Sequence, residues 1–572
     1  MIKDFISLEQ FRNRLTHIDA LPQLVIIGIL SGIATGLVMV LFRLIIELPL
    51  SCWLPSGNAE GFESLPGWAR FALPVSGSLL LFALLSRLAP ESRRVGVVHV
   101  LDRMSYHQGN LPGRNIVVQF FAASIALLSG HPVGREGPAI HLGAGCSSLI
   151  GQHLQLPNNS IRILVGCGTA AAIAAAFNTP LAGIIFAMEV VMLEYTVVGF
   201  TPVIVAAVSA DITMRAIVGP HFAISVPAMQ LQSLAELPWV MLLGLLIGFS
   251  AAGFNLLARQ PARIAHWPLG IRLLLAGVLT GAVAQYYPQV MGIGYDTLDQ
   301  VLNGQIGLGL LCGLFIAKWM LTPLVLGLGI PAGLIGPALF IGAIAGAIIG
   351  LIGHQLAPVS AADSGMYAML GMGAMMGAVL NAPLAALIAL LELTGNPNII
   401  LPAMLAIVIS NLTVRQLFGM PSIFISNLRA QGLDYQHDAL TQALSRSAVG
   451  SMMSTNILCC NPLLETNVTT TLLAEQPDWI VIENEGQHSL LEPDDLKLFI
   501  DQTEQDNIDL LEIPARRRDL SPISFRATLK EALDQMNDHG FDAVLVLSNQ
   551  GQTIGVLTRE QLEHNYYRKQ TS

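Results

Sequence analysis

Long apolar runs recur along most of the chain, and they limit its possible folds more than any other feature. A helix that crosses the hydrocarbon core of a bilayer needs about 20 apolar residues. Only 12% of the 572 residues are charged, about half the share of an ordinary soluble domain. The sequence therefore predicts an all-α polytopic membrane protein with a soluble part attached. The main runs are Leu21–Leu50, Trp68–Leu88, Ile161–Val197, Phe200–Val218, Pro238–Leu257, Ile271–Tyr286, Gly307–Leu328, Ala332–Ile352, Tyr367–Leu393 and Ile399–Leu417.

Several classes of function are disfavoured by the remaining residues. The net charge of −10 comes with no basic face, so we expect no nucleic-acid partner. The adjacent pair Cys459-Cys460 lacks metal-ligand spacing, and the six cysteines suggest no disulfide framework. The apolar runs hold no nucleophile–base set, so we expect neither an enzyme nor an organic cofactor.

The amino-terminal segment predicts the orientation of the chain. It is charged and amphipathic and has no cleavage site of a signal peptide. Lys3, Arg12 and Arg14 precede the first apolar run, which places the N-terminus in the cytoplasm by the positive-inside tendency. With compact loops and no targeting signal, we expect a multi-pass protein of a cell inner membrane.

Breaks in the apolar runs point to transport. The run Ile161–Val197 is too long for one span and is interrupted at Asn178-Thr179-Pro180. Broken helices at membrane depth are tolerated where they face protein or a wet cavity, and they commonly mark ion sites.

An internal repeat strengthens this interpretation. The segment GREGPAIHLGA at 134–144 recurs as GLIGPALFIGA at 333–343, an offset of 199 residues. The segment at 168–189 recurs at 371–392, an offset of 203, with the same N-x-P-L-A core and a terminal Glu. Two halves, at about 20–220 and 235–425, thus carry the same landmarks in the same order. Interrupted segments in matching places of two halves predict a binding site between them.

The stretch Gly130–Gly145 carries the candidate site. Its glycines let backbone N–H groups approach a ligand, and the start of a helix forms an anion site. Glu136 brings a carboxylate that can plug this site until a mobile anion displaces it. The second half has Leu334-Ile335 where the first has Arg135-Glu136, so only one half carries a gate. The alternative is that Glu136 caps a helix at the membrane surface.

Three motifs resemble the CLC family of chloride channels and chloride/proton exchangers. They are G-R-E-G-P at 134–138, A-A-F-N-T-P-L-A-G-I-I-F-A-M-E at 175–189 and N-A-P-L-A-A-L-I-A-L-L-E-L-T at 381–394. The resemblance implies a homodimer with one pore per subunit and about eighteen helices in inverted repeats. It also implies a central anion held by backbone amides, of which Gly134, Arg135, Gly137, Leu334 and Ile335 are candidates, with Glu136 as the external gate.

Some family positions differ in this chain. Ile335 stands in place of Phe in the loop Gly333–Pro337, and it can still contribute its backbone N–H. Val95 stands where the family has an anion-binding Ser, and Phe424 stands at the pore tyrosine. Two hydroxyl donors are missing, each worth roughly 0.5–1.5 kcal/mol. Chloride, nitrate and other small anions therefore remain open as substrates.

The inner proton position also differs. Exchangers of the family carry an acid just after F-A-M-E, where this chain has Val190, as channels do. We therefore expect a voltage- or pH-gated chloride channel that external acid activates. The alternative is a chloride/proton antiporter that uses Glu194, expected on the same helical face as Val190, or Glu189. Both carboxylates could also be ordinary helix-end residues. His99, His131 and His141 could tune gating, although packed or pore-mouth roles are favoured.

The chain changes character after a transmembrane domain at 1–430 and a linker at 431–448. Residues 515–572 show the β-α-β-β-α order of a CBS domain, and 449–505 resemble a degenerate copy. This α/β pair would lie in the cytoplasm. Such pairs bind adenine nucleotides in many families, but Gln561 replaces the usual ribose-binding Asp, with Asp494 or Asp495 as substitutes. A structural or dimer-stabilising tail is favoured over nucleotide sensing.

Overall fold

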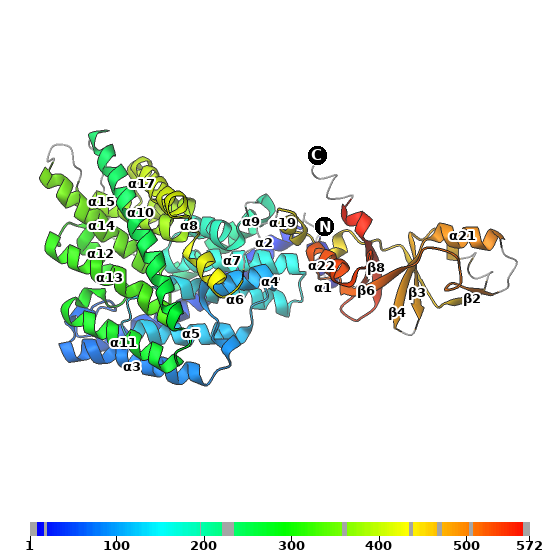
Figure 1. Cartoon of the computed structure of the whole chain (residues 1–572), viewed down its shortest axis with the longest axis horizontal. Coiled ribbons are helices and arrows are strands. Elements are labelled where there is room, and N and C mark those ends of the chain that lie inside the picture. Colours follow the sequence, from blue (N-terminus) through cyan, green and yellow to red (C-terminus); the bar gives the residue numbers. More distant parts are fainter. Residues whose placement is uncertain are drawn as a thin grey trace. The chain divides into compact units, whose positions relative to one another are not determined.

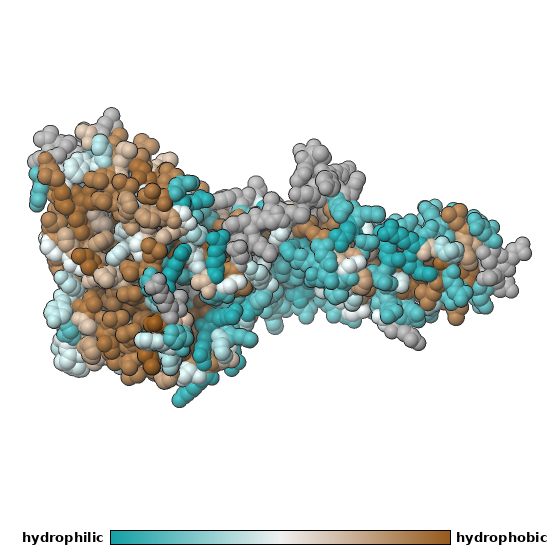
Figure 2. Space-filling model, viewed as in Figure 1, coloured by the Kyte–Doolittle hydropathy of each residue, from teal (hydrophilic) through white to brown (hydrophobic). Residues whose placement is uncertain are grey.

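A computed structural model describes residues 8–16, 20–194, 196–219, 234–356, 363–433, 439–465, 469, 472–484, 486–502 and 507–563. The chain forms two compact units (Figure 1). The membrane unit comprises Val25–His153 and Ile161–Tyr435. The second unit comprises Met1–Leu24, Leu154–Ser160 and Gln436–Ser572. Hydrophobic side chains dominate the visible surface of the membrane unit, whereas hydrophilic ones dominate that of the second (Figure 2).

Eighteen α-helices, α1–α18, precede the C-terminal module in the described residues, and nine of the helical segments there are long and apolar enough to cross a membrane. The short α1 covers Leu8–Leu15. The first half has α2 (Leu21–Trp53), α3 (Gly67–Ser86), α4 (Gly96–Tyr106), α5 (Gly113–Leu128), α6 (Glu136–His153), α7 (Asn158–Phe177), α8 (Pro180–Phe186), which continues as the π-helical segment η4 (Ala187–Met192), and α9 (Val197–Val218). The second half has α10 (Leu237–Arg259), α11 (Leu269–Tyr286), α12 (Tyr295–Leu302), α13 (Leu308–Leu328), α14 (Ile335–Leu356), α15 (Ser364–Leu380), α16 (Pro383–Thr394), α17 (Ile400–Leu412), which continues as the π-helical segment η9 (Thr413–Leu417), and α18 (Ile423–Ala430).

The predicted helix break recurs in both halves for one local reason. Asn178 and Asn381 adopt left-handed backbone conformations, with φ of 61° and 55°, which asparagine tolerates better than most residues. Pro180 and Pro383 then occupy the first helical positions of α8 and α16, where a missing N–H costs nothing.

The two halves contact each other through equivalent elements. Gly134 and Gly333 form an antiparallel bridge in which each N–H donates to the other residue's carbonyl at 2.7 Å. Helix α3 packs on α11 (Figure 1), and α8 packs on α16. These reciprocal contacts confirm the two equivalent halves that the internal repeat predicted.

Glycines allow equivalent helices to approach closely in both halves. A Cβ added at Gly143 in α6 would lie 2.3 Å from the carbonyl oxygen of Gly168 in α7. A Cβ at Gly342 in α14 would lie 2.3 Å from the carbonyl oxygen of Gly371 in α15. Small residues permit such backbone contact within a membrane. The contact fixes α6 against α7 and α14 against α15.

Residues 518–558 of the C-terminal module show the β-α-β-β part of the order expected for the second CBS copy. Its main sheet has the order β1-β3-β4-β6-β7-β8, in which β1 pairs with β3 and β6 with β7 in parallel. A capping box of Thr528 and Glu531 starts α22, the crossover helix of the second copy. The module's elements are α19 (Ala439–Ser445), β1 (Ile457–Cys460), β2 (Leu463–Glu465), β3 (Trp479–Asn484), β4 (Gln487–Leu491), α21 (Pro493–Gln502), β5 (Asn507–Asp509), β6 (Arg518–Ser524), α22 (Leu529–His539), β7 (Ala543–Leu547) and β8 (Thr553–Thr558).

Candidate functional site

The Glu136 carboxylate reaches from one half of the membrane unit to the other. Glu136 is the first residue of α6 and is fully buried. Its Oε2 accepts the backbone N–H of Gly336, in the first turn of α14, at 3.1 Å. Its Oε1 accepts the hydroxyl of Tyr295 at 3.0 Å. The side chain therefore occupies an amide at a helix start that would otherwise be free to bind an anion.

Two glycines provide the space that the carboxylate fills. A Cβ added at Gly134 would lie 2.1 Å from Glu136 Oε2, and one at Gly336 would lie 2.9 Å from Oε1. The loops also meet directly, because a Cβ at Gly137 would lie 2.8 Å from the Cα of Gly333. Any larger residue at these positions would displace the gate carboxylate or separate the halves.

The Arg135 side chain contacts three groups beside the Glu136 site. Its guanidinium pairs with Glu47 at 3.1 Å, donates to the carbonyl of Ala176 at 3.3 Å and lies 5.6 Å from the centre of the Tyr295 ring. With these groups Arg135 lines a cavity of about 270 Å³ that has both polar and apolar walls. Arg135 thus organises the cavity beside the gate through its side chain.

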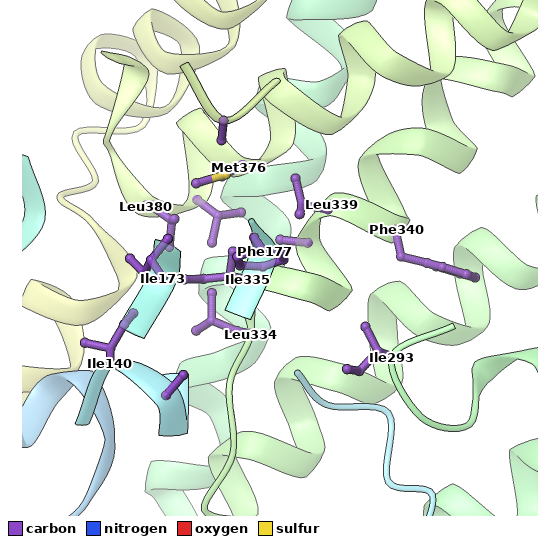
Figure 3. Close-up of a cluster of buried hydrophobic side chains, with 14 of the residues drawn as sticks. Ile140, Ile173, Phe177, Ile293, Leu334, Ile335, Leu339, Phe340, Met376 and Leu380 are labelled. Carbon is purple, nitrogen blue, oxygen red and sulfur yellow. The ribbon is translucent and has the colours of Figure 1, made fainter. Parts of the chain in front are cut away.

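Apolar side chains surround the two predicted residues of the second half. Leu334 and Ile335 are buried within a cluster that includes Ile173 and Phe177 of α7 and Met376 of α15 (Figure 3). A cavity of about 20 Å³ next to Ile335 has almost no polar lining. These two residues can therefore offer an anion only backbone groups.

The other two helix starts with predicted site residues belong to the same region. Val95 is the N-cap of α4, and Phe424 is buried in the first turn of α18. Helix α4 packs against both α6 and α18, and α6 contacts α14. Gln119 of α5 lies close to Gly96 and donates to the carbonyl of Pro331 at 3.0 Å. The four helix starts are thus linked, while Val95 and Phe424 supply no hydroxyl donor.

The carboxylates of Glu189 and Glu194, near the predicted inner proton position Val190, are not placed as the sequence predicted. Val190 is buried in η4. Glu194 does not share its helical face, and that expectation is wrong because Leu193 takes a left-handed conformation (φ 54°) and ends the helix. Glu189 accepts the backbone N–H groups of Leu384 at 3.3 Å and Ala385 at 2.7 Å, at the start of α16.

The three histidines are packed inside the membrane unit. His131 lies between the hydroxyls of Ser78 at 3.2 Å and Thr280 at 3.3 Å. His99 and His141 contact each other through ring nitrogens 2.8 Å apart.

Sequence reasoning missed three residues near Glu136: Tyr295, which binds it, and Lys318 and Glu60, which hold the turn before Tyr295. Lys318 is fully buried in α13 and donates to the carbonyls of Gly292 at 3.2 Å and Ile293 at 2.7 Å. A lysine inside the apolar run Gly307–Leu328 was a usable signal, because charged residues in spans are rarely incidental. Nothing in the sequence linked Tyr295 or Glu60 to Glu136.

The fold and this site define a class of protein: a membrane anion transporter with two inverted halves. The profile of the voltage-gated chloride channel family matches residues 77–415, and that of the CBS domain matches 515–565. The chain is 31% identical over 436 residues to the H(+)/Cl(-) exchange transporter ClcA of Vibrio cholerae, covering 74% of this chain and 91% of that protein. It is 30% identical over 430 residues to ClcA of Vibrio campbellii, with 73% and 91% covered. The chain therefore belongs to the voltage-gated chloride channel family, the CLC family.

Solved structures share the fold. The crystal structure of a slow cyanobacterial Cl−/H+ antiporter matches with a TM-score of 0.64 at 24% identity, over 71% of this chain and 97% of that one. A eukaryotic CLC transporter matches with a TM-score of 0.59 at 17% identity, over 94% of this chain and 97% of that one. The second match extends over most of the chain.

Proposed function

We propose that the protein exchanges chloride for protons across a bacterial inner membrane. Its relatives in two Vibrio species are named as H(+)/Cl(-) exchangers, which favours the antiporter alternative over the channel expected from Val190. The observation that carries the proposal is the bond from Gly336 N–H to Glu136 Oε2. The amide stabilises the ionised carboxylate, and an anion that takes the amide removes that stabilisation. Anion binding and protonation of Glu136 are therefore coupled.

The inner half of the proton route needs a carboxylate other than Glu189. Both oxygens of Glu189 accept N–H groups of α16, so protonation would weaken at least one of the bonds that cap that helix. Glu194 lies just after η4 and outside its helical register. We assign the inner proton acceptor to Glu194.

Passive conduction remains the second candidate, and one residue favours it. Val190 puts an aliphatic side chain at the position where exchangers of the family carry an acid. A channel of this kind would be gated by voltage or by protonation of Glu136, and external acid would activate it.

The proposal includes an assembly and an orientation. We propose a homodimer in the lipid bilayer, with the N-terminus and the C-terminal module in the cytoplasm. The protein acts as a transporter rather than as an enzyme, and it needs no organic cofactor. Blue-native electrophoresis and protease protection of inverted vesicles test these points.

We propose that the C-terminal module is a structural tail. Gln561, which replaces the ribose-binding Asp, donates to the hydroxyl of Ser454 at 2.7 Å and accepts the N–H of Thr558 at 3.0 Å. This side chain thus joins the segment before β1 to the end of β8. Binding of ATP to the purified protein at physiological concentration would contradict a purely structural role.

The reversal potential of purified protein in a planar bilayer tests the function. A chloride gradient sets one potential, and an added pH gradient must shift it if protons are exchanged. Glu136→Gln, which cannot be deprotonated, should abolish this shift and the dependence on external pH. A potential that follows chloride alone would establish conduction, and strong pH gating that survives in Glu136→Gln would remove Glu136 as the gate.

A further inference from the structure

Tyr295 lies between the Glu136 carboxylate and the cavity that Arg135 also lines. Its side chain lines the cavity of about 270 Å³, and its hydroxyl donates to Glu136 Oε1 at 3.0 Å. Glu136 is fully buried and does not line that cavity. Of its two described donors, Gly336 lies at the start of α14, whereas Tyr295 also lines the cavity.

A short turn aims the Tyr295 hydroxyl at Glu136. Gly292 and Gly294 both have positive φ, 61° and 86°, which glycine adopts without strain. The Gly292 N–H donates to the carbonyl of Gly130 at 3.2 Å, and the Lys318 ammonium binds the carbonyls of Gly292 and Ile293. The Gly294 N–H donates to Glu60 Oε2 at 3.1 Å. The residue just before Tyr295 is therefore held by a carboxylate from another part of the chain.

Glu60 is placed to respond to pH. It lies in the connection between α2 and α3, outside both helices, and lines the same cavity as Tyr295. Burial raises the pKa of its carboxyl to about 7, although the Gly294 N–H and Arg135 oppose the shift. The other charged groups facing Glu60 are Asp296 and Lys318.

A neighbouring acid pair extends this cluster. Glu63 lies beside Asp296 of α12 and accepts the hydroxyl of Thr297 at 3.4 Å. Burial raises the pKa of both carboxyls. Glu60 differs from this pair because only its carboxylate binds the amide that precedes Tyr295.

We propose that Tyr295 is a latch on the Glu136 gate and that protonation of Glu60 releases it. The ionised Glu60 carboxylate makes a charge-assisted bond to Gly294 N–H, and such bonds are roughly twice as strong as neutral ones. Protonation weakens this bond and loosens the start of α12, so the Tyr295 hydroxyl leaves Glu136 Oε1. With one donor fewer, the gate carboxylate yields the Gly336 N–H to an incoming anion more readily. The inference rests on the proposed function in taking Glu136 as the gate, and it adds that the cavity is the external entrance to this gate.

Anion efflux from proteoliposomes, measured at external pH 8 and pH 6, tests the latch. Tyr295→Phe removes only the hydroxyl, and we expect efflux at pH 8 to be faster by tenfold or more, from the loss of one hydrogen bond to a charged group. Glu60→Gln removes the charge, and its efflux at pH 8 should approach that of the wild type at pH 6. Because both substitutions release the same latch, adding Glu60→Gln to the Tyr295→Phe variant should not increase efflux further.

Two matched variants serve as controls. Tyr287→Phe removes a hydroxyl that faces Gly313 of α13, and Glu63→Gln neutralises the neighbouring acid; both should keep the wild-type pH profile. An unchanged profile in Glu60→Gln, or a full Glu60→Gln effect on top of Tyr295→Phe, would overturn the latch. Glu60→Gln still decides the question if Tyr295→Phe fails to fold.

The same preparations separate the latch from chloride/proton exchange. If Tyr295→Phe and Glu60→Gln speed efflux while the reversal potential does not change with pH, chloride/proton exchange is refuted and the latch is supported. If the reversal potential responds to pH and neither variant changes efflux, exchange stands and the latch is refuted. A wild-type protein that carries no anion would refute both.

Discussion

Glu189 and Glu392 occupy equivalent places in the two halves. Substituting each by glutamine distinguishes a glutamate that caps a helix from one that transfers a proton. Glu189 accepts N–H groups at the start of α16, and Glu392 accepts those of Leu181 at 2.9 Å and Ala182 at 2.7 Å, at the start of α8. Each half thus closes a helix start in the other. If both glutamates are helix caps, Glu189→Gln and Glu392→Gln must behave alike.

The size of the effect follows from the bonds. A hydrogen bond to a charged group contributes about 1.5–3 kcal/mol. Glutamine keeps one carbonyl oxygen for one amide and presents an NH₂ group to the other, so each substitution loses about one such bond. Both glutamates are partly exposed, so water will replace part of the loss, and we take about 2 kcal/mol. This free energy changes the equilibrium between native and unfolded protein by roughly 30-fold.

Two measurements on purified protein decide between the roles. Denaturation followed by tryptophan fluorescence gives the change in unfolding free energy, and the shift of reversal potential with pH gives proton coupling. For helix caps we expect similar destabilisation in both variants and unchanged coupling.

One outcome would refute this reasoning. If Glu189→Gln abolished the pH-dependent shift while Glu392→Gln kept it, Glu189 would be the inner proton acceptor. Equal stability of both variants and the wild type would show that the carboxylates contribute little as caps.

Three further predictions concern packing and buried polar groups. Gly342→Ala should destabilise the membrane unit by about 1–3 kcal/mol in the same denaturation assay, because the new methyl would meet the carbonyl of Gly371. The control Gly309→Ala should leave the stability unchanged, because no atom lies within 4 Å of its new methyl. Thr528→Val removes the hydroxyl that caps α22 and should lower the stability of this helix by about 1 kcal/mol. Amide hydrogen exchange in Leu529–His539 of the intact protein should then be faster, and unchanged exchange would contradict the cap. Lys318→Met leaves the carbonyls of Gly292 and Ile293 without the ammonium donor. We therefore expect the free energy of unfolding to fall by about 2–3 kcal/mol and efflux at external pH 8 to be faster. A variant with wild-type stability and wild-type efflux would contradict both expectations.

Much of the fold could be predicted from the sequence because the signals are local or repeated. Apolar length predicted the spans, and the repeat at offsets of 199 and 203 residues predicted two equivalent halves. Asn-x-Pro predicted the helix breaks, since asparagine adopts positive φ and proline starts the next helix. The family motifs predicted Glu136 as the gate, although they could not show which atoms bind its carboxylate.

Helical periodicity misled where the helix ended earlier than expected. Placing Glu194 on the face of Val190 assumed a continuous helix, but Leu193 turns into the left-handed region. No proline or glycine marks this end, so the local sequence carried no warning of it.

The sequence by itself determined the architecture of this protein: a membrane domain of two equivalent halves, one glutamate at a glycine-rich helix start and a CBS-type tail. Only the tertiary structure decided the partners of that gate, Gly336 and Tyr295, which lie 200 and 159 residues away along the chain. It also decided that Glu189 and Glu392 close helix starts in the opposite half. Hydropathy and helix breaks depend on neighbouring residues, whereas a hydrogen bond between distant segments depends on how the whole chain packs.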